Sequence, residues 1–104
     1  MQYHVHQNRD TASNKIYPLV LEVQSALLQD LATRVVLPMR KLKDYPAKLI
    51  TKLNPIVGIE GVDYIVLAQQ ISVMPSKFIG TSLMDLTQQQ HSIVSAVDCV
   101  LSGL

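Results

Sequence analysis

Short apolar runs separated by turn-forming residues constrain the fold of this chain more than any other feature. Residues 2–7 alternate polar and apolar, and the polar run Asn8–Asn14 that follows is rich in turn formers. Glu60 and Gly61 separate two further apolar runs, as in a tight hairpin. The segments expected to form strands are residues 2–7, 17–23, 33–39, 55–59, 61–67 and 77–79. Short strands with turn signals at this spacing predict a small antiparallel barrel or sheet.

The end of the chain has a helical period instead. Its apolar residues recur at steps of three and four: Ile93, Val94, Val97, Val100, Leu101 and Leu104. Thr87 and Gln90 have the spacing of a capping box, and Gly103 lies where a helix would end. The sequence therefore predicts one C-terminal α-helix over about residues 87–102.

The connection after the third expected strand is basic. Pro38 is expected to end that strand, and Pro46 limits any helix in residues 41–53. Between residues 40 and 52 a single acid, Asp44, stands against a group of cations: Arg40, Lys41, Lys43, Lys48 and Lys52. This local excess would favour an acidic partner, although an exposed, solvated connection is the simpler interpretation.

Size and composition indicate one small domain over residues 1–104. With 104 residues, 48% of them hydrophobic, the chain has no room for a second core. A domain of this size buries little surface alone, so oligomerisation is expected to add stability. The net charge of +1 gives no reason to expect direct binding to nucleic acid. The lone Cys99 and the lack of a long apolar run or leader favour a cytoplasmic protein without a membrane segment.

Groups that could carry catalysis are few. His4 and His6 would share one face of a strand, but no acid or cysteine with metal-ligand spacing accompanies them. We expect them to be partly exposed sheet residues near an interface. No serine lies in a Gly-x-Ser-x-Gly elbow, and Gly58–Gly61 lacks the lysine of a phosphate loop. The residues thus predict no enzyme, no cofactor and no metal site.

Five stretches follow one another in a distinctive order: Met1–Tyr3, Glu22–Leu28, Arg34–Met39, Pro75–Gly80 and Gly103–Leu104. Together they resemble the CcdB family, the gyrase-poisoning toxins of bacterial type II toxin–antitoxin modules, and the resemblance runs from end to end. It implies a mainly β, SH3-like barrel of the CcdB/MazF type with a C-terminal helix, assembled as a homodimer. It also implies action by binding: the dimer enters between the DNA gyrase A subunits and holds gyrase in its DNA-cleaved state.

The resemblance places the gyrase contacts at the end of the helix and on residues beside it. Carried over by position, they are Asp98, Leu101, Ser102, Gly103 and Leu104, with Leu27, Leu28, Gln2 and Tyr3. For Leu101, as for Val97, simple helix packing is the favoured interpretation, whereas a binding role is favoured for Ser102–Leu104. Plasmid-type members end Trp-Gly-Ile, whereas this chain ends Ser102-Gly103-Leu104, and Asp98 replaces their asparagine. A tryptophan anchor contributes on the order of 2 to 4 kcal/mol, so its loss could weaken binding roughly 30- to 1000-fold.

In this family an antitoxin neutralises the toxin through a disordered segment that folds along the toxin dimer, and the complex represses its own operon. Operator DNA is therefore an expected partner only through that complex. The basic connection at Arg40, Lys43 and Lys48, with Asn8 and Asn14 of the first loop, offers a surface for an acidic segment of a CcdA-like antitoxin.

Two alternatives to gyrase poisoning remain open. One is a CcdB homologue that binds its antitoxin but has weak or no gyrase activity, as the missing tryptophan permits. The other is a MazF-like endoribonuclease, in which Arg34 would be recruited to the RNA backbone.

Overall fold

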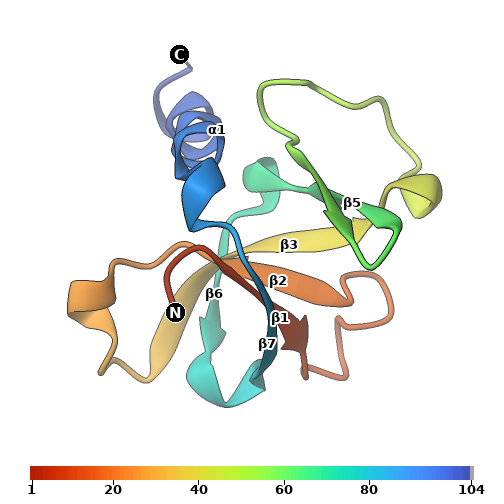
Figure 1. Cartoon of the computed structure of the whole chain (residues 1–104). Helices are drawn as coiled ribbons and strands as arrows, with labels where there is room; N and C mark the ends of the chain where they lie inside the picture. The colour runs from red at the N-terminus through yellow and green to blue at the C-terminus, as the bar shows by residue number, and fades with distance from the viewer. Residues whose placement is uncertain (104) are drawn as a thin grey trace.

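The structure is a computed structural model that describes residues 1–103, and it is mainly β (Figure 1). The strands are β1 His4–Asn8, β2 Leu19–Glu22, β3 Thr33–Lys41, β4 Ile56–Ile59, β5 Val62–Val66, β6 Ser72–Pro75 and β7 Ile79–Asp85. They form one antiparallel sheet in the order β4-β5-β3-β2-β1-β7, with β6 beside β3. This sheet is curled into a half-barrel, and the helix α1, Gln90–Ser102, follows it. The predicted fold class is confirmed.

Strand β3 has two different neighbours on one side. Its first part, Thr33–Val36, pairs with β6, and its last part, Met39–Lys41, pairs with β5. Pro38 lies between these two parts and does not end the strand, so the predicted end was wrong. A proline is tolerated there because the missing N–H falls where the neighbour changes. Its carbonyl is still used, since it accepts a hydrogen bond of 2.9 Å from the Leu67 N–H.

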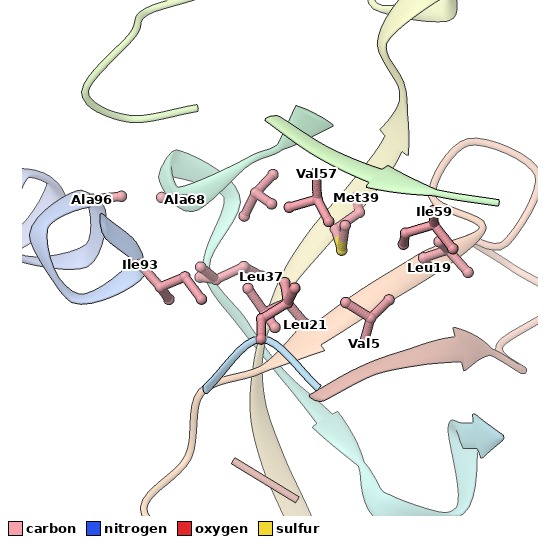
Figure 2. Close-up of a cluster of buried hydrophobic side chains, with 12 residues drawn as sticks. Val5, Leu19, Leu21, Leu37, Met39, Val57, Ile59, Ala68, Ile93 and Ala96 are labelled. Atoms are coloured by element: carbon pink, nitrogen blue, oxygen red, sulfur yellow. The ribbon is translucent and has the colours of Figure 1, made fainter. Parts of the chain in front are cut away.

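The hydrophobic core lies on one face of the sheet (Figure 2). Val5 pairs with Leu21, which pairs with Leu37, and all three side chains are fully buried. Residues paired across neighbouring strands point to the same face of a sheet, and successive residues along a strand point to opposite faces. These three buried side chains therefore mark the face that carries the core. Ile93 and Ala96 of α1 complete the same cluster, so the helix is held over one end of that face.

The second half of the sheet departs from the predicted strands. Residues 77–79 were expected to be a strand, but Ser76–Phe78 is a 3₁₀ turn and β7 starts at Ile79. Strand β6 had not been predicted. Its residues are mostly exposed, so the apolar alternation that reveals a half-buried strand is missing. The hairpin at Glu60 and Gly61 is confirmed, with φ of 51° and 79° as a type I′ turn requires.

The helix starts later than expected and ends where expected. Thr87–Gln89 forms a 3₁₀ turn before α1, and the capping box with Gln90 does not form. Instead the Thr87 hydroxyl and N–H both donate to the Asp85 carboxylate, and these hydrogen bonds lower the pKa of Asp85. Gly103 caps the other end with φ of 76°, its N–H donating to the Cys99 carbonyl. No helix within residues 1–103 has the length and apolar character needed to cross a membrane.

Candidate partner-binding surface

The end of α1 presents an apolar side chain to solvent. Leu101 is 72% exposed, although helix packing had been the favoured interpretation for it. Ser102 turns its hydroxyl back to the Asp98 carbonyl, with a donor–acceptor distance of 2.7 Å. Leu104 lies outside the described residues. Of the positions expected at this end, Asp98, Leu101 and Ser102 are all exposed, and Leu101 is the apolar one among them.

A second exposed apolar pair lies on the connection between β2 and β3. Ala26–Leu28 forms a 3₁₀ turn because the Ser25 hydroxyl accepts a hydrogen bond from the Leu27 N–H. The turn points its side chains outward, leaving Leu27 94% and Leu28 48% exposed. This connection is the segment at the left of Figure 1, drawn in orange.

An apolar groove lies between this connection and the helix. It has a volume of about 260 Å³, and its walls include Tyr3, Leu28, Val35, Ile93, Val94 and Val97. Tyr3 adopts a left-handed backbone conformation, φ 63°, which is uncommon for a residue other than glycine. Backbone hydrogen bonds hold it there: its N–H donates to the Glu22 carbonyl, and its own carbonyl accepts from Leu86.

The structure therefore brings only some of the expected gyrase contacts together. Tyr3 and Leu28 share the groove with the middle of the helix. Leu27 and Leu101 do not line it and instead project from the connection and from the helix end. Gln2 lies near the groove, with its side-chain amide 3.5 Å from the Val23 carbonyl.

The residues expected to meet an antitoxin fall in two places. Lys43 and Lys48 are exposed on the connection after β3, and Arg40 donates to the Asp44 carbonyl at 2.9 Å. Asn8 is only 5% exposed, and its amide donates to the Ser13 hydroxyl and the Tyr17 carbonyl. Its side chain thus shapes the first loop and offers little contact surface. Asn14 lies on the same loop, partly buried.

Sequence reasoning missed a buried charged cluster on the sheet face opposite the core. Glu22 is 1% exposed, and its Oε1 lies 2.7 Å from the amino group of Met1. Its Oε2 lies 3.7 Å from Nε of Arg34, and His6 Nε2 is 3.9 Å from Oε1. An acid inside the apolar run Leu19–Val23 was the signal that could have pointed to this cluster.

The two histidines differ in environment. His6 is 7% exposed, so the expectation of a partly exposed side chain was wrong for it, and its Nδ1 lies 3.0 Å from the Gly80 carbonyl. Burial lowers the pKa of His6, and the nearby N-terminal amine lowers it further, against the opposing effect of the Gly80 hydrogen bond. His4 is partly exposed and meets the Ser82 hydroxyl at 3.0 Å. Within residues 1–103, no three His, Cys, Asp or Glu side chains are grouped to hold a metal ion.

The match to a known family spans almost the whole chain: the family model described as "CcdB protein" aligns with residues 2–103. The chain belongs to the CcdB family. CcdB proteins are toxins of toxin–antitoxin systems, so the chain is a toxin of this class.

Two solved structures of similar fold are mycobacterial proteins. An endoribonuclease in complex with its cognate antitoxin, from a mycobacterial species, has a TM-score of 0.75 at 16% identity, with 100% of this chain and 95% of that chain covered. The Mycobacterium tuberculosis toxin MazF-mt6 has a TM-score of 0.74 at 14% identity, covering 94% of this chain and 95% of that one. At such identities the likeness shows the shared fold alone.

Proposed function

We propose that this CcdB-family protein poisons DNA gyrase by binding the A subunit and trapping the cleaved gyrase–DNA complex. It would act as a cytoplasmic homodimer, by contact rather than by catalysis. A cognate CcdA-like antitoxin would neutralise it, and the toxin–antitoxin complex would bind operator DNA and repress the operon.

One observation carries the proposal. The family positions for gyrase contact include Leu27 and Leu101, and these are the two most exposed large apolar side chains among the described residues. Exposing such side chains to water is unfavourable unless a partner covers them. A leucine at each place can replace part of the contact that plasmid-type members obtain from tryptophan.

The environment of Arg34 argues against an endoribonuclease. Its Nη1 donates to the carbonyls of Leu31 and Thr33, and its Nη2 donates to that of Gln29 at 2.6 Å. With its side chain only 13% exposed, the guanidinium is occupied by the protein itself. Recruiting it to an RNA phosphate would require these bonds to break.

The test is a cleavage assay with purified gyrase and supercoiled DNA, in which linear DNA is scored after denaturant and protease. The intact protein is expected to release linear DNA, and a variant lacking Gly103 and Leu104 is not. Leu27→Ala and Leu101→Ala are each expected to raise the concentration needed by about tenfold. Ile50→Ala is the matched control, because Ile50 is 52% exposed on the basic connection, is not one of the expected gyrase contacts and should change nothing.

A folded dimer that binds its antitoxin but releases no linear DNA at high excess would contradict the proposal. That result would leave the antitoxin-binding homologue as the better description, and RNA cleavage by the intact protein and by Arg34→Ala would be measured next.

A further inference from the structure

We propose that Gln24 is a positioning residue for the gyrase contact, because it holds the connection 25–33 in the shape that presents Leu27 and Leu28. The inference rests on the proposed function and deepens it by assigning a role to a buried side chain, which also forms part of the groove wall.

The connection has no fully buried apolar anchor, since even Leu28 in the groove wall is 48% exposed. Every residue from 25 to 33 is exposed, and the 3₁₀ turn Ala26–Leu28 contains no buried side chain. Core packing therefore cannot fix the shape of this segment. Its conformation depends on hydrogen bonds, which are the other means of ordering an exposed loop.

Gln24 supplies these bonds at both ends of the connection. Its side chain is buried, with 6% exposed, and its Nε2 donates to the carbonyls of Leu28 at 2.9 Å and Thr33 at 3.1 Å. Its Oε1 accepts from the Val35 N–H at 3.1 Å. One amide thus joins the end of the turn that carries Leu27 and Leu28 to the start of β3.

Arg34 supports the same connection from its own side chain. It donates to the carbonyls of Gln29, Leu31 and Thr33, and buried Glu22 lies 3.7 Å from its Nε. The side chains of Gln24 and Arg34 thus donate hydrogen bonds to four backbone carbonyls, those of Leu28, Gln29, Leu31 and Thr33. Ordering the segment before the partner arrives reduces the conformational entropy that binding would otherwise cost.

The test compares Gln24→Met with Asn54→Leu. Methionine and leucine keep similar volume and remove the amide. Asn54 is the matched control because it is also buried, with 1% exposed, and makes a similar set of hydrogen bonds outside residues 25–33. Its amide donates to the Val66 carbonyl and the Gln69 side chain, and its side-chain oxygen accepts from the Ile50 N–H. Both variants are expected to lose thermal stability to a similar extent.

Only Gln24→Met is expected to weaken gyrase binding, by about tenfold, and to speed hydrogen exchange at the Leu28 and Leu31 amides. Equal effects of the two variants on gyrase affinity would overturn the inference, because the effect would then follow general stability.

A double-mutant cycle gives the second readout. In a Leu27→Ala, Leu28→Ala background, Gln24→Met should add no further loss of gyrase affinity, because the side chains that it positions are gone. A full additional tenfold loss would overturn the positioning role. If the intact protein does not bind gyrase at all, the proposed function fails and the inference fails with it. If it binds and the cycle is additive, the inference alone fails.

Discussion

Replacing Arg34 by methionine removes a cation that faces the buried Glu22 beside the Met1 amine. The carboxylate is 1% exposed and keeps the Met1 amine at 2.7 Å from Oε1. Its Oε2 makes no hydrogen bond in the described structure, and the Arg34 Nε lies 3.7 Å from it. The substitution also leaves the carbonyls of Gln29, Leu31 and Thr33 without their donor.

Breaking a buried ion pair by removing one partner costs about 3 to 5 kcal/mol, because the remaining charge is left desolvated. The amine of Met1 stays in place, and the freed carbonyls lie on an exposed connection where water can bond them. We therefore expect the lower limit, a loss of about 3 kcal/mol in the free energy of unfolding. Arg34→Lys should lose less, since it keeps the charge but not the three-carbonyl geometry.

Urea unfolding followed by circular dichroism at pH 7 measures this loss, with protein concentration fixed because the proposed dimerisation would add to apparent stability. Adding Glu22→Gln to Arg34→Met should recover about 1 to 2 kcal/mol, since the uncompensated charge disappears. A loss below about 0.5 kcal/mol for Arg34→Met, or a fully additive double variant, would refute the view that Glu22 depends on this arginine.

Three further predictions test separate features. The folded-state pKa of His6 is lowered below 6.5, so the His6 imidazole binds a proton more tightly in the unfolded chain than in the folded one. The free energy of unfolding should therefore fall as pH drops below about 6.5. Urea midpoints at pH 6.5 and 5.5 should differ less in His6→Gln than in the intact protein. A Cβ on Gly80 would lie 2.8 Å from the Gln7 carbonyl oxygen, so Gly80→Ala should cost about 1 to 3 kcal/mol. Gly58→Ala, with its nearest neighbour at 3.6 Å, is the control and should stay within about 0.5 kcal/mol in the same denaturation series. Glu60→Asn should add about 0.5 kcal/mol, because asparagine suits the positive φ of the type I′ turn; an unchanged or lower urea midpoint would contradict this.

The sequence reveals those parts of the fold in which local pattern and burial agree. Val5 sits in an alternating run, and Leu21 and Leu37 sit in continuous apolar runs of strand length; all three are buried on one face. Strand β6 could not be found in this way, since an edge strand with exposed side chains carries no period. The start of α1 was misplaced because Thr87 bonds the preceding Asp85 and not the helix.

The candidate surface could be predicted only in part. Leu27 and Leu101 were placed through the family resemblance, and their exposure follows from a short turn and a helix end. The groove was not predictable, because its walls come from segments far apart in the sequence, such as Tyr3 and Val97. The contacts of Gln24 were missed for the same reason, as its bonds depend on how the connection 25–33 folds back.

The position of β1 has a consequence for how the toxin is made. This first strand lies between β2 and β7, so its outer edge is paired only by residues 79–85. A ribosome must therefore synthesise most of the chain before the sheet can close over its own beginning. Such long-range pairing is slow, and until then β1 leaves unpaired N–H and C=O groups open to other chains. A nascent or truncated product that stops before Ile79 would thus be inactive and prone to aggregate, which ties toxicity to nearly complete translation.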